Sequence, residues 1–256
     1  TELLGQAARQ QARWALLPEV FCYRGPLARP RQRAEVFESI PGPSTIPLQE
    51  LAVRHRMYIL AGSIYERARM SGRAYNTSVL VDPGGQIVAR YRKRHLFAAQ
   101  IETLAVDETK RFLPGRRLVT ARVDDLLVGM SICFDLRFPE MYQGYARQGC
   151  GVLTVPASFT RHTGQAHWEA LLRARAIENL CYVLAPNQTG EDGQGVPSFG
   201  HSLVISPWGE VLARASGEKE EVVVAEISTR VIDQARSQFP GLIPRRFRFD
   251  IQEPER

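Results

Sequence analysis

Short apolar runs that end in turn signals recur along the whole chain, and segments with helical spacing separate them. The clearest run, Leu126–Ile132, is mostly apolar and continues directly into Cys133. Such runs are typical of buried strands, and strands that alternate with helices are typical of α/β proteins. Two turns, Pro83-Gly84-Gly85 and Pro207-Trp208-Gly209, indicate antiparallel hairpins between them. The sequence therefore predicts an α/β fold with a mixed sheet.

The other elements follow from the same patterns. Helices are expected over Thr1–Gln10, Ile46–Met57, Pro139–Gln148, His167–Asn179 and Thr229–Gln238. Strands are expected over Arg13–Leu17, Tyr58–Ile64, Tyr75–Asp82, Gln86–Tyr91, Val152–Val155, Tyr182–Leu184, Ser202–Ile205, Val211–Ala213 and Glu221–Ile227. Residues Arg94–Gly115 form a long irregular segment, which usually indicates a functional loop. No repeat or linker divides the chain, so residues 1–256 are expected to form a single domain.

Composition argues against several classes of protein. The chain has 44% hydrophobic and 23% charged residues, the balance of an ordinary folded protein. No apolar run approaches the ~18 residues of a membrane helix, so no membrane association is expected. The first residues lack the basic and apolar regions of a secretory signal. The four cysteines form no CxxC pair, which predicts free thiols in a reducing cytoplasm rather than disulfides or structural zinc.

The positive charge raises nucleic-acid binding as an alternative. The net charge is +6, and arginines concentrate in Arg29–Arg33, Arg90–Arg94 and Arg245–Arg248. Acidic residues are interspersed, however, and no nucleic-acid-binding motif accompanies these segments. We therefore expect no nucleic-acid partner.

Three predicted strand ends carry side chains that could take part in a reaction. Cys133 follows a buried strand and precedes a helix, a corner where open α/β sheets place reactive groups. By position alone the better interpretation of Cys133 is a small core residue, because free cysteine is among the most buried residue types. Two further residues change this balance: Glu19 follows the apolar pair Leu16-Leu17 and a proline, and Lys93 ends the strand that begins near Gln86.

A carboxylate, an ammonium and a thiol suit acyl transfer through a thiolate. A nearby carboxylate can remove the thiol proton, and an ammonium stabilises both the thiolate and the oxyanion that forms on attack. Taken singly, Glu19 is also compatible with a solvated helix cap and Lys93 with one charge of a basic edge.

Several segments carry a family resemblance. Three of them resemble the signatures of the nitrilase superfamily of carbon–nitrogen hydrolases, in the family's order and with family-like separations: Leu17-Pro18-Glu19, Tyr91-Arg92-Lys93 and Ile132–Glu140. Others resemble the branch that contains the Nit1-type and Nit2-type amidases: Ala166–Asn179, Gly200-His201-Ser202 and Pro207-Trp208-Gly209. The resemblance covers essentially the whole chain. The superfamily usually opens with a strand before its first helix, and this strand is expected to be missing from the printed sequence.

The resemblance implies a four-layer αββα sandwich without a metal or an organic cofactor, assembled at least to a homodimer. It makes Glu19 the general base, Lys93 the cation that stabilises the oxyanion and Cys133 the nucleophile. A second glutamate often supports the lysine in this family. Glu108 matches that position best and Glu102 less well; the alternative for Glu108 is a surface charge on a loop.

The resemblance also implies a mechanism and a pocket. The thiolate attacks an amide carbon, Lys93 and the N–H of Phe134 bind the oxyanion, and ammonia leaves to give a thioester that water hydrolyses. Pocket residues are expected at Arg137, Phe159 and Thr163. An arginine there suits a substrate carboxylate, as in the ω-amide of a dicarboxylic acid. The alternative for Arg137 is a salt bridge to its neighbour Asp135 or Glu140.

Among amides, the segments Asn187–Gly190 and Ser198–Ser202 favour the branch that hydrolyses deaminated glutathione. The ω-amidases that act on α-ketoglutaramate or α-ketosuccinamate are the alternative, and a nitrilase acting on C≡N fits less well.

Three other interpretations compete with a glutamate–lysine–cysteine amidase. A Cys/His/Asp hydrolase would use His167 or His201 as the base. A metal site of His162, His167 and Glu169 would lack the i, i+4 histidine pair that such helices use. A binding or scaffold relative would keep the fold without the activity, although all three catalytic positions hold competent residues.

Overall fold

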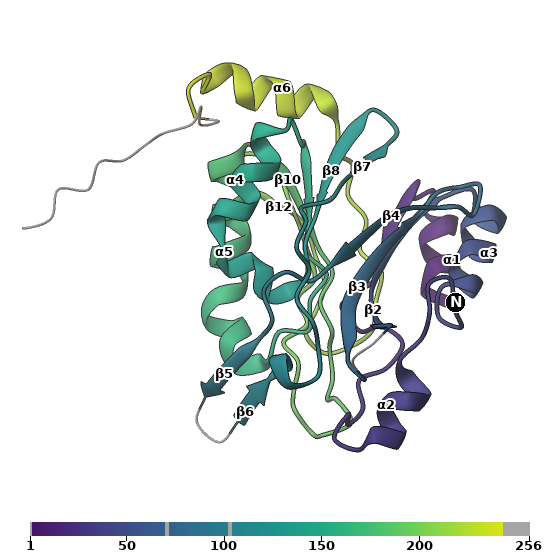
Figure 1. The fold of residues 1–256 in the computed structure, drawn as a ribbon. Coiled ribbons are helices and arrows are strands. Elements are labelled where there is room, and N and C mark those ends of the chain that lie inside the picture. The colour runs from purple at the N-terminus through teal and green to yellow at the C-terminus, as the bar shows by residue number, and fades with distance from the viewer. Residues whose placement is uncertain (1, 70–71, 102–103, 243–256) are drawn as a thin grey trace, which may run out of the picture.

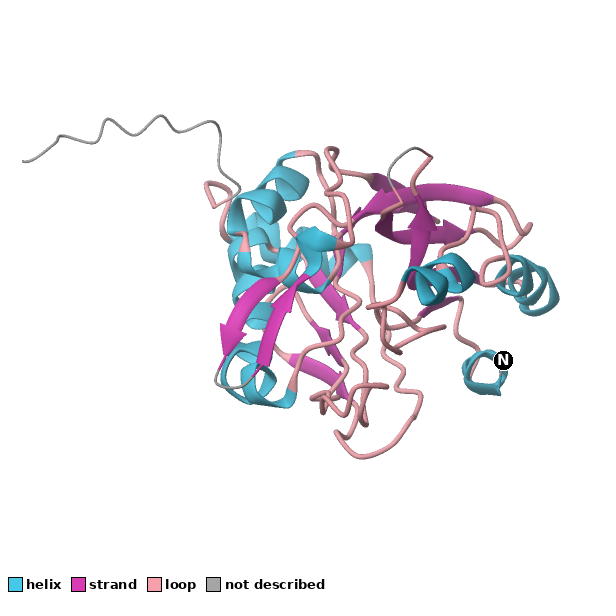
Figure 2. Ribbon diagram, turned by 60° about the horizontal axis from the view of Figure 1, so that its bottom comes forward, coloured by secondary structure: helices cyan, strands magenta, loops and turns pink. Residues whose placement is uncertain are grey.

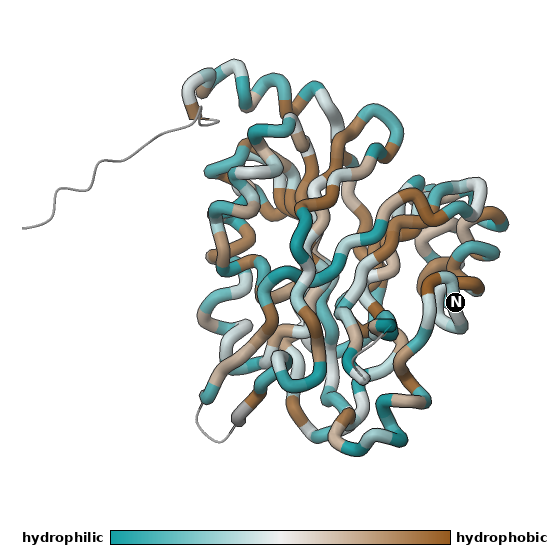
Figure 3. Tube along the Cα trace, viewed as in Figure 1, coloured by the Kyte–Doolittle hydropathy of each residue, from teal (hydrophilic) through white to brown (hydrophobic). Residues whose placement is uncertain are grey.

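Two β-sheets lie face to face in the protein, and helices cover the outer face of each (Figure 1). The computed structural model describes residues 2–69, 72–101 and 104–242. Hydrophobic segments recur along the strands of both sheets (Figure 3), because these strands are enclosed between the sheets and the helices. The expected α/β class with mixed sheets in an αββα arrangement is confirmed.

The first sheet has the strand order β1-β2-β3-β4. Strand β1 runs parallel to β2, and the other pairs are antiparallel. Leu48 and Leu51 on one face of helix α3, together with Leu4 of α1, pack against the outer face of the sheet. The bounds are β1 (Trp14–Leu16), β2 (Tyr58–Arg67), β3 (Ala74–Val81), β4 (Ile87–Arg92), α1 (Glu2–Arg9) and α3 (Ile46–His55).

The second sheet has the order β12-β11-β10-β9-β8-β7, with β8, β9 and β10 parallel to one another. Helices α4 and α5 cover its outer face. Trp168, Leu172 and Ala176 recur every fourth residue on α5 and are fully buried in the core. The bounds are β7 (Thr120–Val123), β8 (Leu126–Met130), β9 (Val152–Thr154), β10 (Tyr182–Ala185), β11 (Leu203–Ile205), β12 (Val211–Arg214), α4 (Pro139–Arg147), α5 (Arg161–Asn179) and α6 (Thr229–Gln238).

Loops gather at the end of the molecule that Figure 2 brings forward. A two-stranded sheet of β5 (Ala98–Ile101) and β6 (Leu104–Asp107) projects there, followed by the 3₁₀ turn η1 (Glu108–Lys110). Helix α2 (Pro30–Val36) lies at the same end of the molecule (Figure 1).

Some sequence-based expectations need correction. Segment 94–115, expected to be irregular, contains the β5–β6 hairpin and η1. Helix α2 was not predicted, because its mostly polar sequence begins at a proline and shows no apolar period. The prediction of a strand over Glu221–Ile227 is wrong. The valines of this segment have high strand propensity, but no strand among the described residues pairs with the segment. Helix α5 begins at Arg161, six residues before the expected start.

No helix among the described residues is long and apolar enough to span a membrane. Of the arginine-rich segments, Arg245–Arg248 lies outside the described residues. Arg90 and Arg92 both pair with the buried carboxylate of Glu66, at 3.2 and 2.7 Å.

One glycine fixes the chain that follows β1. A Cβ atom on Gly62 in β2 would lie 1.8 Å from the carbonyl oxygen of Pro18 and 2.5 Å from that of Leu17. The next residue, Ser63, accepts a hydrogen bond from the N–H of Val20 at 3.0 Å. The segment that carries Glu19 therefore packs directly on the backbone of β2.

Gly62→Ala should lower the free energy of unfolding by at least about 1–3 kcal/mol, because the added methyl group overlaps main-chain atoms that cannot rotate away. Urea denaturation followed by circular dichroism measures the change. Gly5→Ala is the matched control: the nearest atom to its Cβ, on Arg9, is 3.6 Å away, and alanine should stabilise helix α1 by up to about 1 kcal/mol. Equal stability of Gly62→Ala and the wild type would contradict the close approach.

Candidate active site

The three predicted strand-end residues meet at one place. Glu19 follows β1, Lys93 follows β4, and Cys133 opens the 3₁₀ turn η2 (Cys133–Arg137) after β8. The Nζ of Lys93 lies 2.9 Å from Oε1 of Glu19. Lys93 is 1% exposed and Glu19 is 4% exposed, so both charges are removed from bulk water. All three side chains line the same pocket.

Glu108 supplies a second carboxylate to the lysine. Its Oε2 lies 3.0 Å from Lys93 Nζ, and the same carboxylate accepts a hydrogen bond from the N–H of Phe97 at 2.7 Å. Glu108 is therefore a partner of Lys93 and not a surface charge on a loop. Glu102, the weaker candidate, lies outside the described residues.

The two carboxylates keep the lysine charged. Burial by itself lowers the pKa of Lys93, but Glu108 and Glu19 more than offset this, and the pKa stands well above its ordinary value. Burial raises the pKa of Glu108, and Lys93 opposes that rise. A buried cation between two anions is the arrangement that compensates the loss of hydration.

Cys133 occupies a constrained turn. Its φ of 47° lies in the left-handed region, which non-glycine residues rarely adopt, and its N–H donates to the carbonyl oxygen of Pro156 at 2.9 Å. Burial, and then the charge of Glu19, raise the pKa of the thiol well above its ordinary value, although Lys93 acts in the opposite direction. At neutral pH the thiol is therefore protonated and needs a base before it can attack.

Residues that the sequence did not single out hold Glu19 in place. Its Oε1 accepts a hydrogen bond from Asn76 Nδ2 at 2.8 Å, and its Oε2 accepts one from the N–H of Ser158 at 2.9 Å. The side chain of Gln188 donates to the Glu19 carbonyl at 2.8 Å. Gln188 belongs to the segment Asn187–Gly190 that carried part of the family resemblance, which was the one available signal for it.

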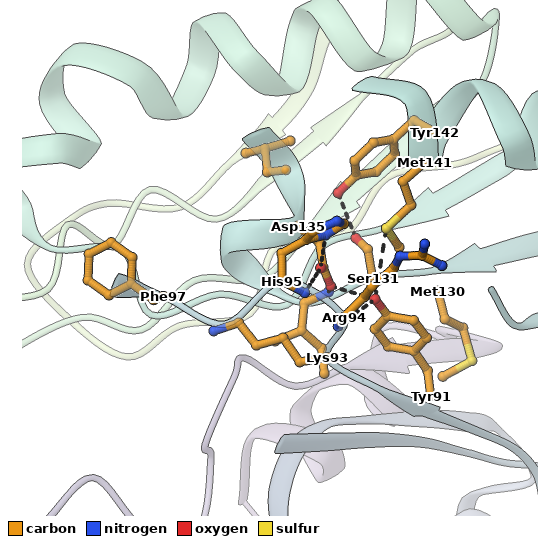
Figure 4. Close-up of polar contacts among 12 residues, drawn as sticks. Tyr91, Lys93, Arg94, His95, Phe97, Met130, Ser131, Asp135, Met141 and Tyr142 are labelled. Carbon is orange, nitrogen blue, oxygen red and sulfur yellow. Dashed lines mark hydrogen bonds and ion pairs between the residues drawn. The ribbon is translucent and has the colours of Figure 1, made fainter. Parts of the chain in front are cut away.

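The buried carboxylate of Asp135 ties the lysine strand to the cysteine turn (Figure 4). One oxygen accepts from the N–H and the Nδ1 of His95, at 2.9 and 2.8 Å. The other accepts from the Tyr91 hydroxyl at 2.6 Å and the N–H of Ile132 at 3.0 Å. In the sequence, Tyr91 and His95 flank Lys93, and Ile132 directly precedes Cys133. Asp135 is therefore a positioning residue that sequence reasoning missed.

Arg137 does not form the salt bridge to Asp135 or Glu140 that the sequence left open. Among the described residues its guanidinium contacts His167 Nδ1 at 3.2 Å and faces the rings of Phe134 and Phe159, 5.8 and 5.6 Å from their centroids. Asp135 takes its donors from Tyr91, Ile132 and His95 instead.

A pocket of about 430 Å³ opens beside the three strand-end residues. The three expected pocket residues, Arg137, Phe159 and Thr163, all line it, and so does Phe134, whose N–H is expected to bind the oxyanion. The pocket also has walls that the sequence did not predict, from Arg24, Arg111 and Asp192 among others. These residues lie in loops, where neither periodicity nor a motif marked them.

Comparison with known proteins places the chain in a family. The family model for carbon–nitrogen hydrolases matches residues 1–237. The chain belongs to the carbon–nitrogen hydrolase family. This carbon–nitrogen hydrolase is 41% identical over 250 residues to the deaminated glutathione amidase of Synechocystis, across 96% of this chain and 90% of that one. It is 39% identical over 236 residues to the omega-amidase NIT2 of Homo sapiens, across 92% and 83% of the two chains.

Solved structures have the same fold. The C. elegans NitFhit protein matches with a TM-score of 0.84 and 31% identity, over 96% of this chain and 60% of that chain. A carbon–nitrogen hydrolase from Helicobacter pylori G27 matches with a TM-score of 0.84 and 26% identity, over 96% and 88%. The expected nitrilase-like fold is thus confirmed, as is a hydrolase that acts on carbon–nitrogen bonds other than peptide bonds.

The two histidines considered as bases in this carbon–nitrogen hydrolase, His167 and His201, have other partners. His201 Nδ1 contacts the carbonyl oxygen of Phe199 at 2.7 Å, and His167 contacts Arg137. Neither histidine lines the pocket that Cys133 lines. Within the described part of the chain, no three His, Cys, Asp or Glu side chains lie close enough to hold a metal ion, so the proposed grouping of His162, His167 and Glu169 is not formed.

The pKa of the Cys133 thiol should fall in Glu19→Gln and rise in Lys93→Met, because Glu19 raises this pKa and Lys93 lowers it. The thiolate should therefore form at lower pH in Glu19→Gln than in the wild type. Thiolate absorbance measured against pH gives both values, with Cys133→Ala subtracted to remove the other three cysteines. A Glu19→Gln titration at or above the wild-type pH would contradict the assigned contacts.

Proposed function

We propose that residues 1–256 form one domain that hydrolyses a small carboxylate-bearing amide through a thioester on Cys133. The observation that carries this proposal is the Lys93 ammonium, held by Glu19 and Glu108, beside a protonated thiol in one pocket. A base, a cation and a nucleophile are thus available within one enclosed site.

Glu19 acts first, as the base that takes the Cys133 proton while the thiolate attacks the amide carbon. The carbonyl oxygen becomes an oxyanion as the C–S bond forms. Lys93 Nζ and the N–H of Phe134 bind this oxyanion. The N–H of Phe134 is suited to this role because it lies in the first turn of η2, where an N–H has no acceptor within the helix.

The tetrahedral intermediate then collapses. The C–N bond breaks, the proton held by Glu19 passes to the leaving amine, and Cys133 carries the acyl group as a thioester. Glu19 next removes a proton from water, which attacks the thioester carbon. The C–S bond breaks, the acid leaves, and the proton on Glu19 returns to the Cys133 thiolate. Glu108 does not contact the reacting atoms; it keeps Lys93 charged and aimed through its 3.0 Å contact.

The substrate that we propose is deaminated glutathione, which is the activity named for the Synechocystis relative. Arg137 in the pocket supports a carboxylate on the acyl part of the substrate. The alternative is a short ω-amide such as α-ketoglutaramate, supported by the omega-amidase NIT2 relative. The leaving groups differ: a short ω-amide releases ammonia, whereas deaminated glutathione releases the amine of cysteinylglycine.

Wild-type protein should hydrolyse at least one of deaminated glutathione, α-ketoglutaramate and α-ketosuccinamate, and Cys133→Ala and Glu19→Gln should hydrolyse none of them. Release of keto acid is measured by coupled reduction, because this product is common to amides with different leaving groups. Cys150→Ala is the matched control, since Cys150 is buried away from the pocket. Activity of Glu19→Gln within tenfold of the wild type would rule out Glu19 as the general base.

We also propose a homodimer in the cytoplasm. Apolar side chains are exposed together where α5, the β11–β12 turn and the end of α6 meet: Ile177 45%, Trp208 51% and Phe239 45%. The rings of Trp208 and Phe239 lie 5.6 Å apart, and the turn packs on Ile177. Such a contiguous apolar patch supports an interface between copies. The four free thiols support a reducing compartment.

Trp208→Asp should shift the protein from dimer to monomer, because it places a charge in the centre of the apolar patch. Sedimentation equilibrium of the wild type and the variant measures the mass. Val88→Asp, which replaces another exposed apolar residue on β4, is the control and should remain dimeric. A monomeric wild type, or a dimer that Trp208→Asp does not affect, would rule out this interface.

A further inference from the structure

Four basic side chains line the pocket, and two of them have partners that hold them. Lys93 lies between its two carboxylates, as described above. Arg24 donates through Nη1 to the carbonyl oxygen of Thr189 at 2.8 Å and through Nη2 to Ser198 Oγ at 2.5 Å. The charge of Asp192 also acts on Arg24. Arg24 therefore ties the loop before α2 to the loop after β10.

The other two arginines, Arg137 and Arg111, have no carboxylate partner among the described residues. The backbone of Arg111 is fixed, because its N–H donates to Glu108 at 3.0 Å and its carbonyl accepts from Ala74 at 3.1 Å. The side chain of this half-buried residue, however, makes no hydrogen bond or ion pair with any residue that the structure describes. An unpaired guanidinium that faces a cavity from a fixed backbone favours an anionic ligand.

The two arginines come from different segments that border the pocket. Arg137 lies in η2, four residues after Cys133, and Arg111 follows η1. Phe97 and Phe134 also line the pocket, with their rings 5.1 Å apart. The pocket thus offers two sites for anionic groups and an apolar surface, which suits a ligand that carries two carboxylates joined by an uncharged chain.

We propose that Arg111 binds a second carboxylate of the substrate, on the amine side of the scissile bond, while Arg137 binds the carboxylate on the acyl side. This assignment rests on the proposed amidase function and narrows its substrate class to amides of a keto acid with an amino acid or dipeptide. Deaminated glutathione carries one carboxylate on the acyl side of the scissile bond and one on the amine side. α-Ketoglutaramate carries only the acyl-side carboxylate, because its leaving group is ammonia.

The test compares three substrates in the wild type, Arg111→Gln and Arg137→Gln. The substrates are deaminated glutathione, its glycinamide analogue that lacks the second carboxylate, and α-ketoglutaramate. Arg111→Gln should lower kcat/KM for deaminated glutathione relative to the other two by roughly 10- to 100-fold, mainly through KM, because one charge-assisted contact is lost. Arg137→Gln should lower kcat/KM for all three.

Two further variants distinguish the effect of the charge at position 111 from the effect of removing any positive charge from the protein. Arg111→Lys should recover part of the loss, because an ammonium keeps the charge without the bidentate geometry. Arg117→Gln, an exposed arginine outside the pocket, should match the wild type with every substrate. An equal effect of Arg111→Gln on all three substrates, or none on deaminated glutathione, would overturn the assignment.

Binding separates this inference from the proposed function. The dissociation constant of deaminated glutathione is measured calorimetrically for Cys133→Ala with and without Arg111→Gln. Binding that weakens in the double variant supports Arg111 even if the wild type hydrolyses none of the amides, and only the amidase proposal then fails. Turnover by the wild type together with binding that does not depend on Arg111 would reject the Arg111 assignment alone. No binding of deaminated glutathione to either variant would reject the Arg111 assignment and deaminated glutathione as the substrate, and the amidase proposal would then depend on the short ω-amides.

Discussion

The ammonium of Lys93 is the group on which the rest of the site depends. It is 1% exposed, so water cannot stabilise its charge, and Glu19 and Glu108 compensate it at 2.9 and 3.0 Å. Removing the ammonium from such a buried cluster typically costs about 3–5 kcal/mol, because the charges of the two carboxylates are then uncompensated. The three residues come from distant parts of the sequence. Folding of the whole domain and assembly of the chemical site are therefore the same event.

Main-chain contacts set the geometry of this cluster. Gly62 lets the chain before Glu19 lie against β2. Gly115 allows a similar close approach beside Lys93. The N–H of Gly115 donates to the Lys93 carbonyl at 2.8 Å, and a Cβ atom on Gly115 would be 2.1 Å from the carbonyl oxygen of Arg92. Asp135 adds four hydrogen bonds between the lysine and cysteine segments. The segments that carry the charges are thus fixed by main-chain contacts in addition to the side-chain contacts within the cluster, which favours a preorganised site.

The sequence predicted the parts of the structure that depend on regular patterns. The apolar run before Cys133 and the strands that end near Glu19 and Lys93 are where periodicity placed them, because a buried strand needs a continuous apolar face. Segment 221–227 shows the limit of this reasoning. Its valines favour a strand, but a strand also needs a neighbour to pair with, and that is a tertiary property.

The supporting residues of the site were beyond the reach of sequence reasoning for a similar reason. Asn76 and Ser158 hold the carboxylate of Glu19 from distances of 57 and 139 residues along the chain. An asparagine inside a strand and a serine in a loop carry no local signal of such a role. Their function follows only from the sheet register that brings them to Glu19. The motif residues, in contrast, were recognisable because their chemistry is unusual at a strand end.

The backbone of Cys133 shows what this arrangement costs the fold. At a φ of 47° a glycine would adopt the turn without a steric penalty, whereas a residue with a side chain gives up about 1–3 kcal/mol of stability. Selection for stability alone would favour glycine at this position. A thiol there is retained only while its reactivity is useful, so a relative that had lost its chemistry would be free to become more stable at this very residue.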